Sequence, residues 1–272
     1  MAIDTDEIMN VALELVGWKK MPADSAIHVK GREITKVLIA VDVTSAELML
    51  AKSLRCDAVI AHHPLASSSL NFHKVLDRHI DFMVGHGVPL QKAEDRVNEL
   101  KNRIETKSHS HIYDQVVDVA RILGMPLVNI HQPCDEYMRR KILERANTGN
   151  LDLVLDIVKS IEDIPEFRNA LTRIKVPYGS LKNKIGQWAL VIAAGTNGGF
   201  PIAKAYFEHG ISTVIYLHID YNDLRKMYDE KLNGNVIVLG HLAGDSIGLN
   251  ALADRLESKG LETIRLGIIS AK

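Results

Sequence analysis

Histidines and aspartates gather at three places where an apolar run of the chain ends. The pairs are His62 and His63, His131 and Asp135, and His241 and Asp245. Imidazole together with carboxylate is a ligand set for Zn, Fe, Mn, Ni or Co, and several carboxylates allow two ions to be bridged. If the three run ends meet in the fold, the sequence predicts a shared metal site.

The first pair follows residues 58–61, an apolar run with β-branched members that Asp57 precedes and that is typical of a buried strand. Pro64 cannot continue a strand, so the chain turns away directly after His63. In an open α/β sheet, ligands bind at the carboxyl ends of the strands, which favours a metal site here. The alternative is structural: one histidine hydrogen-bonded in the core and the other capping a loop.

Two more residues, Asp42 and Thr44, are expected near this pair. Residues 35–41 are predicted to form a strand, and residues 45–54 a helix that leads into the strand 57–61. Such a βαβ unit has parallel strands and a right-handed crossover, so both strands end at the same edge of the sheet. Helix capping is the alternative role for Asp42 and for Thr44.

The remaining pattern alternates strands with helices, which predicts the α/β class with mostly parallel sheets. Further strands are expected at 88–90, 125–130, 188–194, 211–217, 236–239 and 262–269. Helices are expected at 5–16, 74–84, 93–105, 112–123, 200–209 and 247–258, and from about residue 136. The run 141–178 is expected to be largely helical, and the Ser-rich residues 66–69 are expected to form a loop.

For four other features, a purely structural role is the alternative to a functional one. The Gly-rich turn 195–199 could hold an anion at the start of a helix, or be only a tight strand-to-helix turn. His109 and His111 precede a helix and are expected to be solvated capping residues. Asp135 could cap the helix that follows it, and Cys134 is expected to be a structural thiol.

The composition of the 272 residues is that of a soluble globular protein. Lys plus Arg number 33 and Asp plus Glu number 34, which gives a net charge of −1. This balance disfavours nucleic acid and acidic membranes as partners. Two cysteines, Cys56 and Cys134, fit a reducing cytoplasm, and no apolar run approaches the ~18 residues that span a bilayer. We therefore expect a cytoplasmic protein without a membrane segment.

Three motifs together resemble one protein family. They are residues 41–64, which end in His62-His63-Pro64, residues 131–135 and residues 240–245. In this order and combination they are similar to the NIF-three superfamily, which is named for an Ngg-one-interacting factor and is also labelled GTP cyclohydrolase one type two-like. The match covers most of the chain.

The resemblance implies an α/β fold of two intertwined lobes, with mostly parallel sheets and a dinuclear metal site between them. The first lobe would be residues 1–140 and the second residues 141–272, whose C-terminal part returns to the shared site. The resemblance also implies a homo-oligomer, usually a toroidal homohexamer. The implied ligands of two divalent ions per subunit are His62, His63, Asp135, His241 and Asp245.

Two features depart from the family's pattern. Its last acidic position is usually Glu, and here it is Asp245, which is one methylene shorter. The segment between the first two motifs also looks longer than usual, and it carries the charged helix 93–105 and the tract with His109 and His111. By resemblance, Asp135 and Asp245 would be the bridging carboxylates, with His131 close by.

These observations support two hypotheses about function. The first is a metal-dependent hydrolase that acts on a small anionic or nucleotide-like substrate through a metal-activated water. Asp42, His131 and His218 are candidates for a general base. The second is a non-catalytic metal-binding, metal-handling or regulatory scaffold protein, which a fully ligated site without an open position would favour. The cyclohydrolase label rests on family analogy alone.

Overall fold

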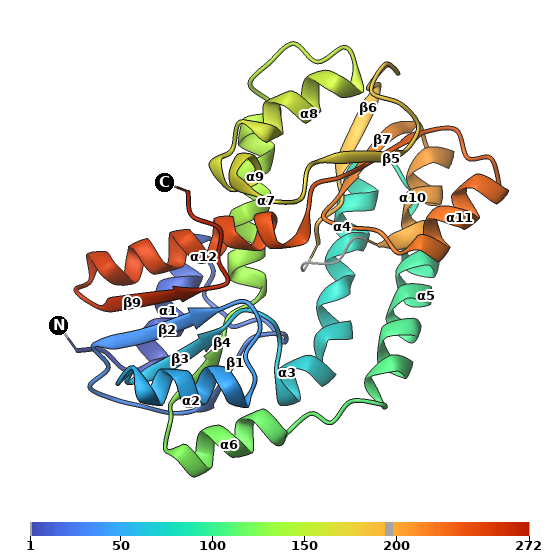
Figure 1. Cartoon of the computed structure of the whole chain (residues 1–272). Coiled ribbons are helices and arrows are strands. Elements are labelled where there is room, and N and C mark those ends of the chain that lie inside the picture. Colours follow the sequence, from blue (N-terminus) through green and yellow to red (C-terminus); the bar gives the residue numbers. More distant parts are fainter. Residues whose placement is uncertain (1, 194–197, 272) are drawn as a thin grey trace. The chain divides into compact units, whose positions relative to one another are not determined.

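The computed structural model describes residues 2–193 and 198–271, and the chain packs into two compact units (Figure 1). The units are built from separated segments: residues 1–75, 105–137 and 245–270 in unit 1, and residues 76–104 and 138–244 in unit 2. This segmented α/β organisation agrees with the expected intertwined fold. The sequence predicts two lobes, residues 1–140 and 141–272, and this division stays a prediction.

Unit 1 is built on a five-stranded sheet in the order β1-β4-β3-β2-β9. Its strands are β1 (Ala26–Val29), β2 (Lys36–Ala40), β3 (Ala58–Ala61), β4 (Leu127–Asn129) and β9 (Glu262–Leu266). β3 pairs in parallel with both β2 and β4, β9 pairs in parallel with β2, and β1 forms an antiparallel edge beside β4. The expected βαβ unit is confirmed, and β3 is the central strand.

Helices cover both faces of this sheet, because its inner strands bury alternate side chains on opposite sides. From β2, Val37 and Ile39 enter one core with side chains of α1 and α12, whereas Leu38 and Ala40 enter a second core with side chains of α2 and α6. The helices of unit 1 are α1 (Thr5–Leu15), α2 (Ser45–Ser53), α3 (Ala66–Leu70), α6 (Gln115–Leu123) and most of α12 (His241–Ser258).

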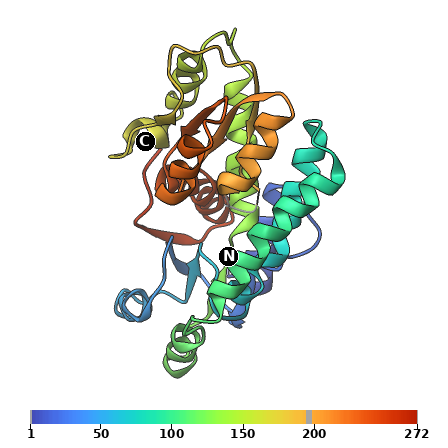
Figure 2. The same cartoon turned by 90° about the vertical axis from the view of Figure 1, so that its right-hand side faces the viewer.

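Unit 2 is built on a four-stranded sheet in the order β5-β8-β7-β6. Its strands are β5 (Lys175–Tyr178), β6 (Gln187–Leu190), β7 (Ile211–Tyr216) and β8 (Asn235–Val238), with β5 as an antiparallel edge. Its helices are α4 (Arg78–Gly85), most of α5 (Leu90–Ser108) and α7 (Gln132–Ala146), α8 (Val154–Glu162), α9 (Pro165–Asn169), α10 (Gly199–Glu208) and α11 (Tyr221–Asp229). Figure 2 shows α5 as a long blue-green helix. No helix within the described ranges is both long enough and apolar enough to cross a bilayer.

Two short segments differ from the sequence-based expectation. Residues 66–69 are not a loop but part of helix α3, because the Ser68 hydroxyl donates to the Leu65 carbonyl at 2.6 Å and accepts from the Leu65 N–H at 3.1 Å. Residues 88–90 are not a strand, since α5 already begins at Leu90. In both cases a local hydrogen-bonded turn outweighs the composition of the segment.

The run 141–178 is helical in α7, α8 and α9, as expected, but it ends in strand β5. The proline in this strand, Pro177, fits an edge, where a missing N–H does not interrupt a ladder. β1 and α11 are further elements that we did not predict. Two helices also begin before their predicted starts, α7 at Gln132 and α12 at His241, which places Asp135 and Asp245 inside helices.

Candidate metal centre

The end of β3 is held by backbone hydrogen bonds that continue past the strand itself. The His62 N–H donates to the Ala40 carbonyl at 2.9 Å, and the His63 N–H donates to the Val41 carbonyl at 3.0 Å. The main chain of both histidines is therefore fixed against the end of β2. His62 is fully buried, whereas the side chain of His63 is 27% exposed.

Both imidazoles are oriented through their Nδ1 atoms. His62 Nδ1 lies 3.0 Å from the Ile130 carbonyl oxygen, and His63 Nδ1 lies 2.7 Å from a carboxylate oxygen of Asp42. These oxygens only accept hydrogen bonds, so each neutral ring carries its proton on Nδ1 and leaves Nε2 for a ligand. The proximity of Asp42 to His63 is confirmed, whereas Thr44 caps α2, which is its alternative role.

Two aspartates on different helices face these Nε2 atoms. Asp135 lies in the first turn of α7, and its Oδ1 is 3.3 Å from His62 Nε2. Asp245 lies on α12, with Oδ1 3.7 Å from His62 Nε2 and Oδ2 3.4 Å from His63 Nε2. One strand end and two helices thus bring four of the predicted ligands together within unit 1.

Burial leaves polar atoms of His62 and Asp135 poorly satisfied. Asp135 and Asp245 are each 2% exposed. Among the described residues, His62 Nε2 and both Asp135 carboxylate oxygens have no partner in hydrogen-bonding geometry, although His62 Nε2 and Asp135 Oδ1 are 3.3 Å apart. Buried polar atoms are rarely left in this condition. A cation bound between them would satisfy the lone pairs, so this donor set fits a metal ion.

The same carboxylates control the protonation of the histidines. Burial by itself lowers the pKa of His62, but the negative charges of Asp245 and Asp135 outweigh burial and raise this pKa well above its usual value. For His63, burial again lowers the pKa, but a hydrogen bond to Asp245 is the largest of the effects that raise it overall. Protons on the histidines thus compensate the aspartates, and a metal ion has to compete with those protons.

The close approach of the two aspartate-bearing helices requires a glycine. A Cβ atom at Gly248 of α12 would lie 2.3 Å from the carbonyl oxygen of Cys134, in the first turn of α7, and 2.8 Å from its Cα. These are backbone atoms, which cannot rotate away as the end of a side chain can. The backbones of α7 and α12 therefore touch within one helical turn of both carboxylates.

His131, the histidine after β4, is held by an aspartate that the motifs do not reveal. Its Nδ1 lies 2.8 Å from Oδ2 of Asp24, and its ring centroid is 4.8 Å from that of His62. Asp24 is fully buried and stands two residues before β1. We did not predict this strand; the signal that could have found it is the apolar–polar alternation of residues 27–29.

The last predicted ligand, His241, is the first residue of α12 and belongs to unit 2. It precedes Asp245 by one helical turn, a spacing that puts both side chains on the same side of a helix. Its ring centroid is 4.8 Å from that of His218, which follows β7. The role of His241 as a ligand stays a prediction from this spacing and from the family resemblance.

The Gly-rich turn is only partly described, because residues 195–197 lie outside the described residues. Gly198 and Gly199 stand at the start of α10, both with positive φ. A Cβ atom at Gly199 would lie 2.4 Å from a carboxylate oxygen of Asp223. Because this acidic group already faces the start of the helix, the described part favours a tight strand-to-helix turn over an anion site.

The other singled-out residues have separate surroundings. His109 and His111 are exposed between α5 and α6. Cys134 is buried in the core that contains side chains of α1 and α12, and burial raises the pKa of its thiol. A raised pKa suppresses the reactive thiolate, as expected for a structural thiol.

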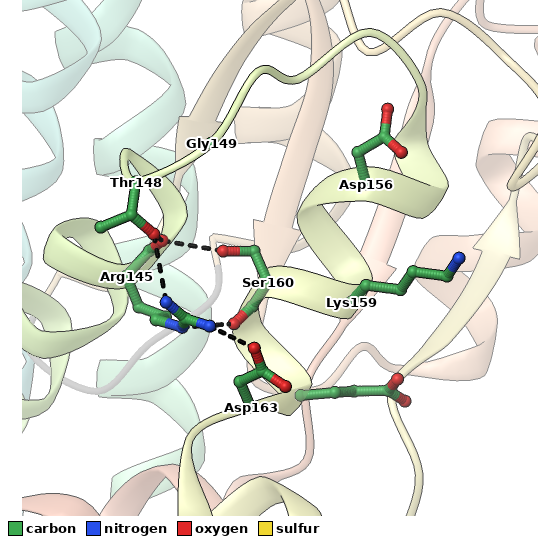
Figure 3. Close-up of a pocket in the computed structure, with 8 residues that line it drawn as sticks. Arg145, Thr148, Gly149, Asp156, Lys159, Ser160 and Asp163 are labelled. Carbon is green, nitrogen blue, oxygen red and sulfur yellow. Dashed lines mark hydrogen bonds and ion pairs between the residues drawn. The ribbon is translucent and has the colours of Figure 1, made fainter.

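A concave surface lies in unit 2, at the end of α7 and along α8 (Figure 3). Its Arg145 is already engaged, since Nε donates to the Ser160 carbonyl at 3.1 Å and Nη2 pairs with Asp163. Asp156 and Lys159, in the same pocket, attract each other electrostatically. Because these charges compensate one another, this pocket is a weaker candidate than the buried cluster of unit 1.

Known proteins share this architecture. The family model described as Duf34/NIF3 (NGG1p interacting factor 3) matches residues 26–272. The crystal structure of a NIF3 superfamily protein from Sphaerobacter thermophilus is 41% identical, with a TM-score of 0.94 over 98% of this chain and 99% of that chain. No curated protein matches the chain by sequence.

Two more distant structures show the fold alone. Reduced HcgD from Methanocaldococcus jannaschii is 14% identical, with a TM-score of 0.61 over 98% of each chain. The hypothetical protein SA1388 from Staphylococcus aureus is 11% identical, with a TM-score of 0.57 over 97% of this chain and 96% of that chain. The resemblance inferred from the three motifs is confirmed by a family model that spans nearly the whole sequence, and the chain belongs to the Duf34/NIF3 family.

Proposed function

We propose that this protein binds two divalent metal ions and uses them to hydrolyse a small anionic or nucleotide-like substrate. The proposed ligands are His62, His63, Asp135, His241 and Asp245, with the two aspartates as bridging carboxylates. One observation carries the proposal: His62 Nε2 and the Asp135 carboxylate are buried together without a hydrogen-bond partner among the described residues. By family resemblance we also propose a homohexamer, and from the two cysteines, which fit a reducing compartment, a location in the cytoplasm.

The energetic argument concerns the cost of buried charge. A buried carboxylate costs several kcal/mol unless an opposite charge or hydrogen bonds compensate it. Here two carboxylates lie within 3.7 Å of one imidazole nitrogen, inside a packed core. Apolar side chains of similar volume are often at least as stable as a buried charge cluster, so the presence of these charges in the core supports a functional role for them.

The chain's own residues would orient and shield the site. The Ile130 carbonyl and the Asp42 carboxylate direct Nε2 of His62 and His63 toward the aspartates, as outer hydrogen-bond partners of metal ligands do. The side chain of Asp42 is 79% exposed and His63 is partly exposed, so this side of the cluster is open to a substrate. Two bound divalent ions would supply water activation and polarisation of the electrophilic centre.

A non-catalytic metal-binding or metal-handling role is the second candidate. It is favoured by the burial of His62, Asp135 and Asp245, since ligands of structural sites are enclosed and leave no open position. The two candidates share the metal and differ in whether a substrate can reach it.

The metal is tested by elemental analysis of the purified protein after incubation with Zn²⁺, Mn²⁺ or Fe²⁺ and removal of the excess. We expect about two ions per chain in the wild type, as for a site with bridging carboxylates, and a loss of at least half of them in Asp135→Asn. The control is Asp118→Asn, because Asp118 is an exposed residue paired with Arg121 on the surface of α6. Metal content that is equally low in all three proteins would contradict the proposal.

Hydrolysis is tested by offering the metal-loaded protein nucleotides and phosphoesters. Turnover should require the metal and should be lost in His62→Gln and in Asp135→Asn, because each removes a proposed ligand. Turnover that survives both substitutions would indicate a contaminant. Stoichiometric metal without turnover of any substrate would favour the second candidate.

A further inference from the structure

The aspartate that no motif contains, Asp24, makes a buried carboxylate–imidazole pair with His131. Asp24 Oδ2 is 2.8 Å from His131 Nδ1, and neither residue is more than 5% exposed. Asp42 and His63 make a similar pair at 2.7 Å, but there the carboxylate is largely exposed. The first pair is therefore the more shielded from water, and the stronger constraint on its histidine.

The direction of this hydrogen bond fixes which nitrogen of His131 is available. A carboxylate oxygen accepts, so Nδ1 carries the proton and Nε2 keeps its lone pair. Nitrogens of His62, His63 and His131 lie within 4.8 Å of one another. The rings of His62 and His63 are held by Nδ1 in the same way, so all three imidazoles offer Nε2 when they are neutral.

A second acceptor competes for the same proton. Asp135 Oδ2 lies 3.4 Å from His131 Nδ1. Without Asp24, His131 would turn its N–H toward Asp135, which would occupy a proposed metal-binding carboxylate. Asp24 thus has two effects: it exposes Nε2 of His131, and it leaves the oxygens of Asp135 without this hydrogen bond.

The main chain on either side of this pair is held by hydrogen bonds to other residues. The Asp24 carbonyl accepts from Asn129 Nδ2 at 2.7 Å, and the His131 N–H donates to Ser25 Oγ at 3.0 Å. The Ser25 hydroxyl in turn donates to Asp24 Oδ1 at 3.5 Å, so a substitution that removes the Asp24 carboxylate loses this long contact but keeps both main-chain hydrogen bonds. The role of the carboxylate is therefore tested first in the wild type and then in variants that are shown to be folded.

We propose that Asp24 is a positioning residue that selects the Nδ1–H tautomer of His131 and so makes His131 a fourth imidazole ligand of the metal site, in addition to His62, His63 and His241. The ligand role rests on the proposed metal-binding function, whereas the tautomer does not depend on it. Two measurements, one without metal and one with metal, keep the two statements apart.

The tautomer is read from the metal-free protein labelled with ¹⁵N-histidine, by long-range ¹H–¹⁵N correlation at mildly alkaline pH. The signals of His131 are assigned by their loss in His131→Gln. We expect a protonated Nδ1 and a bare Nε2 in the wild type. A proton on Nε2 would overturn the proposal, and this measurement needs only the wild type to be well folded.

Two substitutions of similar size distinguish the loss of the hydrogen-bond acceptor from the loss of the negative charge at residue 24. Asp24→Asn keeps an oxygen that can accept the Nδ1–H bond, and it should keep the tautomer. Asp24→Leu removes the acceptor, and it should give a mixture of tautomers or a shifted Nδ1 signal from a bond to Asp135. An unchanged His131 spectrum in a folded Asp24→Leu protein would overturn the proposal, whether or not the wild type binds metal.

The ligand role is read from titration with Co²⁺ alone, followed by visible absorption. Loss of an outer partner of a ligand histidine typically weakens metal binding about 10–100-fold, and we expect this for Asp24→Leu. Asp24→Asn should bind nearly as tightly as the wild type, and Asp42→Asn should lose less than Asp24→Leu because its pair is exposed. Equal Co²⁺ binding by Asp24→Leu and the wild type would overturn the ligand role. A wild type that binds no Co²⁺ would instead contradict the proposed metal function.

Discussion

Replacement of Gly248 by alanine is expected to lower the free energy of unfolding by about 3 kcal/mol, at the upper end of the range for overpacking, and to remove most metal binding. The added Cβ would lie 2.3 Å from the Cys134 carbonyl oxygen and 2.6 Å from its carbonyl carbon. Because both are backbone atoms, α12 must move away from α7. Asp245 stands three residues earlier on α12 and would move away from Asp135. Thermal unfolding followed by circular dichroism should show a fall of roughly 6–12 °C.

Two other glycines are matched controls for this substitution. A Cβ at Gly85, the last residue of α4, would meet no atom within 4 Å, so Gly85→Ala should be neutral or stabilise by up to about 1 kcal/mol. A Cβ at Gly244 would lie 2.5 Å from Leu217 Cδ2, the end of a side chain that can rotate, so Gly244→Ala should cost less than Gly248→Ala. Equal metal loss in the Gly244 and Gly248 variants would contradict the argument from backbone contact.

Metal affinity is expected to rise steeply with pH, by about tenfold per pH unit for each proton that the metal displaces. The physical reason is the raised pKa of His62, whose proton is held against the cost of burial by Asp245 and Asp135. His62 has to lose this proton before its Nε2 can bind a cation. Zn²⁺ titrations at several pH values in competition with a chelator measure the slope.

The metal-free protein should show the opposite dependence. Since the pKa of His62 is higher in the folded than in the unfolded chain, its contribution to stability is fully present below the unfolded value of about 6.5. This contribution is lost as pH rises from there through the folded pKa. Unfolding of the chelator-treated protein is therefore expected to become easier as the solution becomes more alkaline.

The variant His62→Gln isolates this effect from other titrating groups. Glutamine carries no titrating proton, so the variant should lose the His62 part of the alkaline destabilisation, and it should bind metal weakly at every pH. If the wild type and His62→Gln showed the same change of stability with pH, the assignment to His62 would be wrong.

The part of the site on β3 could be predicted because the sequence there repeats a simple physical pattern. Residues 58–61 are apolar because the strand is central and covered on both sides, and the polar pair His62 and His63 follows directly at the carboxyl end of the strand. The proximity of Asp42 followed from the parallel pairing of β2 and β3. Periodicity and strand direction are local properties, and a single sequence carries them.

Asp24 could not be predicted for the opposite reason. It meets His131 only because β1 pairs antiparallel with β4 across about a hundred intervening residues, a distance in sequence that no local pattern spans. The early starts of α7 and α12 were missed because their first turns contain residues that are common in loops, Pro133 in α7 and Gly244 in α12. Tertiary contacts, such as that between Gly248 and Cys134, make those turns helical.

The two adjacent histidines, His62 and His63, differ in exposure, and we expect one to control how strongly a metal ion is bound and the other how fast it exchanges. His62 and Asp135 are enclosed by the core, so they would contribute mainly to how tightly an ion is held. His63 and Asp42 are at the solvent side, so rearrangement of their hydrogen bond would limit how quickly an ion enters or leaves. His62 would thus mainly retain the metal ion, and His63 would mainly control its exchange with solvent.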